Sequence, residues 1–342
     1  EARLTDVAGA SAAVVVDLLT YSARGRFVGP AHSLSLRGAA THLIPPGGYG
    51  YDLLQRRPLV AGRPEPAPAA AGRTFAALRL PAGCGPLWLA GGLAGDPAGA
   101  VTQRFAALSG GPAARLVVLA LGYAQTAEAQ ADAQAFAAAL HSQAAAVAWF
   151  VLEAKLDQAA LQGALGPATG VLITAPDQSR VLDALAGAPA VVSALRARWQ
   201  QGLALLADNA AAAALGEAVS LNAPSTAASL EADAVRSFRA DGVPIRPGLA
   251  FVPGVAVEPR LLPDRHWGQL YNHVHRRPAR LAVGVDVNTA LELSASGATV
   301  VGESAVVTLD GRCAGFSLGS NGALGARWVL LDTFAAGEPV HP

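Results

Sequence analysis

Short apolar segments alternate with alanine-rich segments in the middle of the chain, and this alternation constrains the fold most. Stretches such as Ala127–Leu140 and Val191–Gln201 have helical character, and apolar runs of strand length flank them. Strands that alternate with helices in this way are typical of a parallel sheet with helices on both faces. The sequence therefore predicts an α/β fold from about Leu87 onward, with strands at Leu87–Ala90, Arg115–Ala120, Val147–Leu152, Val171–Thr174 and Leu203–Leu206.

Both ends of the chain are predicted to form additional β-hairpins. Residues 1–59 hold strand-like runs, and a linker rich in proline, alanine and glycine follows over residues 60–86; the runs are Ala12–Leu19, His32–Leu36 and Thr41–Ile44. Short strands return after about Ser220, at Leu281–Val285, Thr299–Val301, Ala305–Leu309 and Arg327–Leu331. The predicted organisation is a β-rich segment over residues 1–59, the linker, and an α/β domain over residues 87–342.

The two ends of the chain also resemble each other. Residues 6–17 align with residues 299–310 after a one-residue adjustment, and residues 36–45 parallel residues 324–331. Each half has the pattern of a strand, a turn and a second strand. We predict a genuine internal repeat, and the alternative is that β-hairpins in an alanine-rich chain look alike.

The composition excludes several classes of protein. The 25 basic and 25 acidic side chains give a formal net charge of zero, whereas nucleic acids and anionic membranes require a strongly basic surface. Only 15% of the residues are charged and 52% are hydrophobic, which excludes a disordered chain. No uninterrupted apolar run reaches the roughly 18 residues that a membrane-spanning helix needs. We therefore predict no nucleic-acid partner and no membrane span.

The absence of methionine and the start at Glu1 lead to a prediction about the compartment. Export with N-terminal processing would explain both features, so we predict a secreted or periplasmic location. The two cysteines, Cys84 and Cys313, lack the spacing of metal ligands. They are expected either to form one disulfide or to be two buried thiols. No feature of the sequence predicts a metal or a cofactor.

Several segments, in order along the chain, resemble the cyanophycinase and peptidase E family of serine peptidases. Residues 105–119 resemble that family's helix, Gly-Gly turn and second strand, and residues 170–178 resemble its strand ending in Gly-Gly-Asp-Gln. Residues 195–202 look like the helix before its nucleophile strand, and residues 283–291 look like its Gly-Ile-Asp-Glu-Asp-Thr-Ala-Leu stretch. The resemblance covers roughly residues 87–342 and implies an α/β fold of the class I glutamine amidotransferase type.

The resemblance also locates the three positions that carry catalysis in this family. Such an enzyme needs a nucleophilic serine, a histidine that accepts its proton and an acid that orients the histidine. The family's serine falls on Asn209, its histidine on Arg260 and its acid on Val287. An amide cannot form an acyl-enzyme, a guanidinium stays protonated near neutral pH, and valine has no acidic group. His266 is the alternative base if the alignment contains a gap.

Other residues of the family's cleft are retained. Asp177 and Gln178 match the family pattern, and Asp208 precedes the nucleophile position. We expect Asn209, Arg260 and Val287 to converge beside Asp177 at the C-terminal ends of the strands. A buried guanidinium at Arg260 would need a carboxylate partner, and Asp177 or Asp208 is expected to provide it.

The resemblance therefore predicts a catalytically inactive cyanophycinase-like protein that acts as a binding or structural subunit. The alternative is a serine-type peptidase or isopeptidase with a non-standard site around His266. Because enzymes of this family commonly pair, the expected partner is a related family-like chain or a second copy, in a dimer or larger assembly.

The N-terminal hairpins are expected to dock on such a partner, with the chain's own core as the alternative, because a small hairpin buries too little apolar surface to be stable alone. Residues 44–53 look like the segment that ends a domain of the family. This likeness predicts that residues 1–59 are the tail of a preceding family-like domain.

Overall fold

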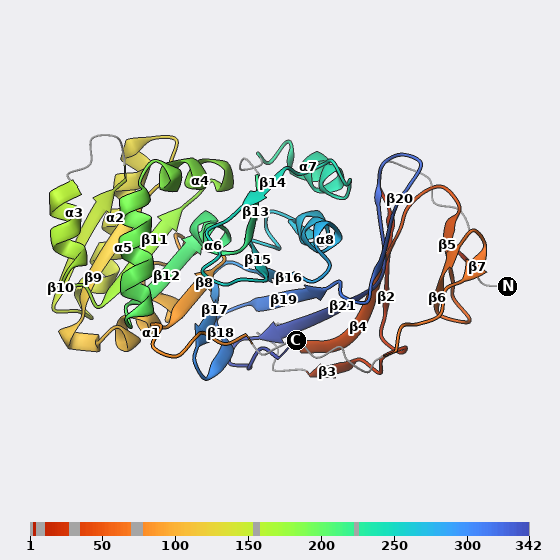
Figure 1. The fold of residues 1–342 in the computed structure, drawn as a ribbon, viewed down its shortest axis with the longest axis horizontal. Coiled ribbons are helices and arrows are strands. Elements are labelled where there is room, and N and C mark those ends of the chain that lie inside the picture. The colour runs from red at the N-terminus through yellow and green to blue at the C-terminus, as the bar shows by residue number, and fades with distance from the viewer. Residues whose placement is uncertain are drawn as a thin grey trace.

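A seven-stranded sheet forms the centre of the computed structural model, which describes residues 3–4, 11–26, 35–69, 78–152, 158–221 and 226–341. Its strand order is β10-β9-β11-β12-β8-β17-β18 (Figure 1). The first five strands in this order run parallel, and β17 and β18 are antiparallel. The prediction of a mostly parallel sheet is confirmed; the strands are β8 (Leu87–Ala90), β9 (Arg115–Ala120), β10 (Ala146–Val151), β11 (Gly170–Ala175), β12 (Ala204–Asn209), β17 (Thr289–Ser294) and β18 (Gly297–Gly302).

Helices cover both faces of this central sheet. Alternate strand residues point to opposite faces, so Leu87 and Leu89 join one hydrophobic cluster while Trp88 joins another. The Trp88 face packs against α1 (Ala100–Leu108) and α2 (Thr126–His141) through Phe105 and Phe136. The opposite face packs against α3 (Gln158–Leu165), α4 (Gln178–Ala186), α5 (Pro189–Gln200) and α6 (Ala210–Leu215).

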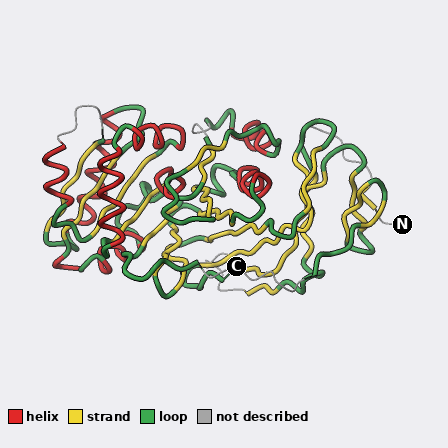
Figure 2. Tube along the Cα trace, viewed as in Figure 1, coloured by secondary structure: helices red, strands yellow, loops and turns green. Residues whose placement is uncertain are grey.

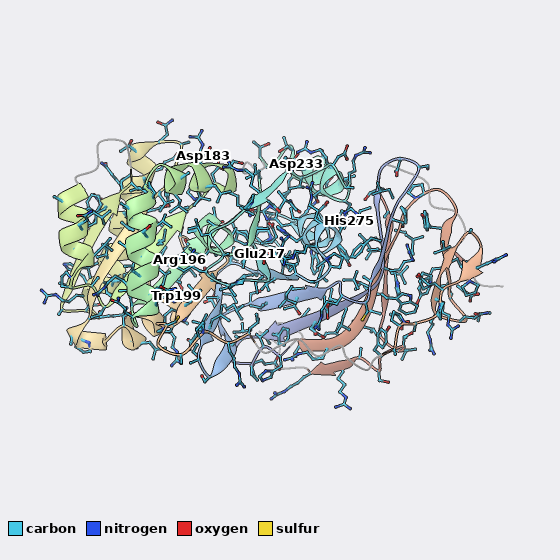
Figure 3. The ribbon with its side chains drawn as sticks, in the orientation of Figure 1. Asp183, Arg196, Trp199, Glu217, Asp233 and His275 are labelled. Carbon is cyan, nitrogen blue, oxygen red and sulfur yellow. The ribbon has the colours of Figure 1, made fainter. Side chains whose placement is uncertain are left out.

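One glycine shows how closely the segment between α5 and β12 approaches the start of β8. A Cβ atom on Gly85 would lie 1.9 Å from the Leu203 carbonyl oxygen, so only glycine fits there. The Trp199 indole donates to the Gly85 carbonyl at 2.9 Å, and the Arg196 guanidinium lies over the Phe251 ring. Figure 3 shows Arg196 and Trp199 on α5, beside the central sheet.

A second sheet continues the molecule toward its N-terminal end, and the helix over residues 267–276 packs against it (Figure 1). Its order is β15-β16-β19-β21-β4-β2, and β3 and β20 pair with β4 and β21 beside this path. The strands are β2 (Ala13–Asp17), β3 (Arg24–Arg26), β4 (Ser35–Ile44), β15 (Val255–Pro259), β16 (Leu281–Val285), β19 (Ala305–Asp310), β20 (Gly315–Leu318) and β21 (Leu324–Ala335).

Smaller elements complete the fold. Strands β1 (Arg3–Leu4), β5 (Tyr49–Asp52), β6 (Arg57–Val60) and β7 (Arg63–Pro64) form a small sheet, and β13 (Ala218–Ser220) pairs with β14 (Ile245–Pro247). The remaining helices in the described part of the chain are the 3-10 turn η1 (Gly111–Ala113), α7 (Leu230–Ser237) and α8 (Trp267–Arg276). Figure 2 shows most helices at one end of the molecule, α7 and α8 near its middle, and only strands and loops at the N-terminal end.

The N-terminal strands dock on the chain's own core, so the expectation that they dock on a partner is wrong. Strand β4 lies between β2 and β21, and it pairs with β21 from Ala326 to Thr333. Both strands bury apolar side chains in a shared cluster, which includes Ala39, Leu43 and Val329. The two runs predicted at His32–Leu36 and Thr41–Ile44 belong to this single strand, and residues 32–34 lie outside the described residues.

The two cysteines are not bridged. Cys84 precedes β8 and is partly buried, whereas Cys313 lies exposed in the turn after β19, in the other sheet. The alternative of a disulfide is therefore wrong for this structure. The alternative of two buried thiols holds only in part, because Cys84 is partly buried and Cys313 is exposed. Among the described residues, no helix is long and apolar enough to cross a membrane.

Candidate functional site

A cavity of about 290 Å³ opens at the C-terminal ends of β8, β11 and β12. In open α/β sheets this edge is where ligands bind. The three positions predicted from the triad, Asn209, Arg260 and Val287, all line this cavity, together with Gly92, Ala94, Gly95, Tyr123, Asp132, Thr174, Ala175, Pro176, Asp208 and Asn288.

Asn209 stands at a sharp turn between β12 and α6. Its backbone torsions are φ 54° and ψ −123°, in a region that non-glycine residues rarely occupy. Such strain persists only where the surrounding structure imposes it, and it concentrates at functional sites. Here β12 pairs with both β8 and β11, and every residue of α6 is buried. The turn between β12 and α6 is thus a sharp strand-to-helix turn, of the kind that carries the nucleophile in α/β-hydrolases, and an asparagine stands on it.

Arg260 follows β15 and reaches the same cavity. Its backbone N–H donates to the Gly91 carbonyl at 2.9 Å, which joins this turn to the end of β8. A Cβ atom on Gly92 would lie 3.3 Å from the Arg260 Cγ, so glycine makes room for the side chain. The guanidinium donates to both carboxylate oxygens of Asp264, from Nε at 2.8 Å and from Nη2 at 3.2 Å.

The partner predicted for Arg260 is wrong. We expected Asp177 or Asp208, but Asp264 lies four residues further along the same turn and forms the bidentate pair. The hydrogen bond to Asp264, opposed by burial and supported by the charges of Asp264 and Asp208, raises the pKa of Arg260. Arg260 therefore cannot serve as a general base.

A hydrogen-bond network that the sequence did not reveal crosses the floor of the cavity. The buried Asp208 carboxylate accepts from the Leu93 N–H at 2.8 Å and from the Thr174 hydroxyl at 3.1 Å. The Tyr123 hydroxyl contacts Thr174 at 3.2 Å and donates to Asp132 at 2.8 Å. Burial raises the pKa of Asp208 to about 7, although its two hydrogen bonds act in the opposite direction.

Val287 and Asn288 close the cavity on the side of β17. The Asn288 N–H donates to the Gly92 carbonyl at 2.9 Å, and its carboxamide donates to Glu303 at 3.0 Å. Neither of these two side chains is a carboxylate.

Three other predicted residues do not line the cavity. Asp177 caps α4 and accepts from the backbone N–H groups of Ser179 and Arg180. Gln178 is buried, and its carboxamide donates to Glu258 at 3.2 Å. The alternative base His266 places Nδ1 3.0 Å from the Pro259 carbonyl and 3.7 Å from Glu258. These are the contacts that the His266 ring makes within the described residues. Neither of them involves a hydroxyl or thiol nucleophile.

A second polar cluster lies buried behind β15, and sequence reasoning missed it as well. Glu258 is fully buried and lies 2.8 Å from the His273 Nε2. The Ser220 hydroxyl lies 3.0 Å from the same nitrogen. In a serine peptidase the acid and the serine contact different nitrogens of the histidine. Because both groups contact Nε2 and none of the three is accessible, this cluster is a structural network.

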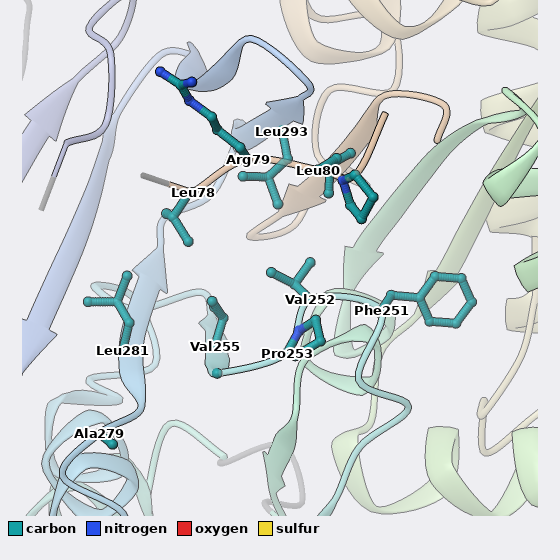
Figure 4. Close-up of a pocket in the computed structure, with 12 residues that line it drawn as sticks. Leu78, Arg79, Leu80, Phe251, Val252, Pro253, Val255, Ala279, Leu281 and Leu293 are labelled. Atoms are coloured by element: carbon teal, nitrogen blue, oxygen red, sulfur yellow. The ribbon is translucent and has the colours of Figure 1, made fainter. Parts of the chain in front are cut away.

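A further cavity of about 240 Å³ has a mainly apolar lining (Figure 4). It lies between residues 78–81 and residues 251–255, with Leu281 and Leu293 beside them. It holds no pair of nucleophile and base. No group of three or more metal-ligating side chains was found among the described residues.

Solved structures of peptidases are similar to this chain. The crystal structure of a peptidase from an acI-B1 Actinobacterium matches with a TM-score of 0.52 and 16% identity, over 76% of this chain and 97% of that chain. The chain has a peptidase E-like fold. A putative peptidase E protein from Listeria monocytogenes EGD-e gives a TM-score of 0.44 and 13% identity, over 64% of this chain and 98% of that chain. No protein-family model and no curated protein matches the chain.

The peptidase E-like fold confirms the resemblance predicted from the sequence, at the level of the fold. At such low identity the match concerns the fold alone, because one fold can host unrelated functions. The chemistry of this chain has to be argued from its own residues.

Proposed function

We propose that this chain is a non-hydrolytic protein with a peptidase E-like fold, and that the cavity at Asn209 binds a small polar ligand without cleaving it. The observation that carries the proposal is the residue on the strained turn after β12. Asn209 stands on a strand-to-helix turn of the kind that carries nucleophiles, it lines the cavity, and its carboxamide cannot form an acyl-enzyme.

The remaining groups of the cavity support this proposal. No histidine is among its lining residues, and the Thr174 hydroxyl donates to Asp208. Arg260 places a positive charge where a base would have to accept a proton. The amide, hydroxyl, carboxyl and guanidinium groups of the lining are suited to hold polar ligand groups by hydrogen bonds.

Reaction with a fluorophosphonate tests the absence of hydrolysis. We expect no labelling of the purified chain, because no activated serine faces the cavity, while an active serine hydrolase in the same mixture is labelled. Stoichiometric labelling of the chain would contradict the proposal. If that labelling were lost in His266→Ala, the alternative of a serine-type peptidase or isopeptidase around His266 would be supported.

Binding is tested with a mixture of short peptides as the probe, because the similar solved structure is that of a peptidase. A ligand that binds only the folded state raises the melting temperature. We expect a rise for the wild-type chain, recovery of the peptides uncut, and no rise for Val287→Phe, which fills the cavity. An equal rise in both proteins would place the binding elsewhere.

We further propose that the chain associates with a related chain or with a second copy through the second sheet. The two similar segments start at Leu36 and at Leu324. The sixth residue of the first is Thr41 and that of the second is Val329. These two residues pair with each other across β4 and β21. Antiparallel pairing of equivalent strands at equivalent residues is the geometry of a twofold-related pair. Strand β4 thus fills, within the chain, the place beside β21 that the equivalent strand of a related chain would take, so association has to use the free edge of this sheet.

The edge of the second sheet supports the same proposal. Strand β2 ends this sheet, and Val14 and Val16 on it are 55% and 49% exposed. An apolar edge strand is a template for pairing with another chain. We expect the wild-type chain to be larger than 34 kDa by light scattering and Val14→Lys/Val16→Lys to be a monomer, with the exposed Leu54→Lys as the unchanged control. A wild-type monomer would exclude the second copy and leave a related chain as the partner.

A further inference from the structure

We propose that Asn209 is a site of spontaneous backbone modification, at which its side chain cyclises onto the backbone nitrogen of Ala210 and releases ammonia. This inference does not depend on what the cavity binds. It arises from the backbone torsions of Asn209, from the position of its side chain and from the chemistry of the carboxamide.

The ψ angle of Asn209 already has the value that the cyclic product requires. The substituents of a tetrahedral carbon are spaced by a third of a turn, so a ψ of −123° makes the Cα–Cβ bond eclipse the C–N bond to Ala210. A five-membered succinimide ring contains both of these bonds and must hold them nearly eclipsed. In a helix, with ψ about −42°, or a strand, with ψ about +135°, the two bonds are far from eclipsed.

The reacting atoms also have room to meet. The Asn209 side chain lines the cavity and makes no capping hydrogen bond to α6. The Ala210 N–H is the first of that helix, and the first N–H groups of a helix have no acceptor within it. Neither group has to break a helical hydrogen bond before it reacts.

The reaction balances without a co-reactant. A base from solvent takes the proton of the Ala210 N–H, and the nitrogen attacks Cγ of Asn209. The bond from Cγ to Nδ2 breaks, and Nδ2 leaves as ammonia with the proton returned to it. Water can then open the succinimide at either carbonyl, which leaves aspartate or an isoaspartate whose extra methylene lies in the backbone between β12 and α6.

The sequence alone would place such a reaction elsewhere. Asn321 precedes Gly322, and glycine hinders attack by the following nitrogen least. An unfolded chain is therefore expected to react first at Asn321, whereas the folded chain is expected to react at Asn209. Asn272 is a suitable internal reference, because it is buried in α8 and its amide donates to the Ser237 carbonyl at 2.7 Å.

Peptide-resolved mass spectrometry tests the proposal on the full chain, incubated folded and in denaturant, with hydrolysis traced in heavy-oxygen water. We expect Asn209 to lose ammonia about 5- to 30-fold faster in the folded chain, the factor that corresponds to fixing the backbone of one residue in advance. Asn272 should remain intact in the folded chain. Asn209→Gln should stop the reaction at this position and leave that of Asn321 unchanged, because a longer side chain forms the ring far less readily.

Two results would overturn the proposal. One is an Asn209 amide that stays intact in the folded chain while Asn321 reacts. The other is a rate at Asn209 that is equal in the folded and the denatured chain, since the inference requires the fold to hold the reactive torsion. The comparison uses the wild-type chain, so it does not depend on whether the Gln variant folds.

Discussion

Replacing Glu258 with alanine is expected to lower the free energy of unfolding by about 2–6 kcal/mol, because two buried polar groups lose their acceptor and each such loss costs about 1–3 kcal/mol. Glu258 is fully buried, and its carboxylate contacts His273 at 2.8 Å and the Gln178 amide at 3.2 Å. Without the carboxylate, these polar groups lose their acceptor in a place that water does not reach. Denaturation by urea, followed by circular dichroism, measures the change.

A matched surface variant separates this effect from the loss of any ion pair. Glu231 pairs with Arg265, but its side chain is 84% exposed. Glu231→Ala is expected to cost about 0–1 kcal/mol, because solvent screens exposed pairs. If the two variants had similar stability, the buried network would not contribute what its geometry indicates.

The pH dependence of the Glu258 contribution has a definite sign. Burial alone would raise the pKa of Glu258, but its hydrogen bond with His273 and the charges of His273 and His266 outweigh burial and lower it. A lowered carboxyl pKa contributes stability at neutral pH, and this contribution disappears as the pH falls through the folded-state value. On acidification, the free energy of unfolding should therefore fall by less in Glu258→Ala than in the wild-type chain.

The strands of the central sheet could be predicted from the sequence because their signal is local. Leu87–Ala90 and Arg115–Ala120 are short apolar runs with clear limits, and β8 and β9 have those bounds. The order of the strands could not be predicted. Strand β8 comes first along the chain in this sheet and yet lies between β12 and β17, and nothing in an apolar run specifies its neighbours.

The docking of the N-terminal strands was mispredicted for a related reason. The length of the linker showed that residues 1–59 could reach away from the core, but not that they do. The pairing of β4 with β21 depends on a complementary edge and on buried residues such as Leu43 and Val329, which lie far apart along the chain.

The candidate site was predictable only where its residues follow strands. Asn209 ends β12 and Arg260 follows β15, so their positions could be aligned from the sequence. The contacts among Tyr123, Thr174 and Asp208 could not, because these residues come from three segments without a shared motif. Asp264 was overlooked as the partner of Arg260 because a turn, with φ 53° at Arg260, brings the two together.

Replacing Asp208 with asparagine is expected to remove a large pH dependence of stability. The pKa of this carboxyl is raised from 3.8 to about 7, with burial as the main cause. The folded state thus favours the protonated form, and the stability that this form contributes is lost as the pH rises from about 4 to about 7. A shift of about three pKa units corresponds to about 4 kcal/mol over this window, as an order of magnitude.

The variant can keep the neighbours of Asp208 in place, which makes the comparison clean. In Asp208→Asn the carboxamide oxygen can still accept from the Leu93 N–H, and the amide can donate to Thr174, whose hydroxyl is free to rotate. We then compare the free energy of unfolding of Asp208→Asn with that of the wild-type chain at each pH. The difference in favour of the variant should be larger at pH 8 than at pH 4.5, by up to about 4 kcal/mol. Asp183→Asn, at an exposed position on α4, is the control and should follow the wild-type profile. Parallel profiles for the wild type and Asp208→Asn would mean that Asp208 does not take up a proton on folding, and that the floor of the cavity carries a full negative charge at neutral pH.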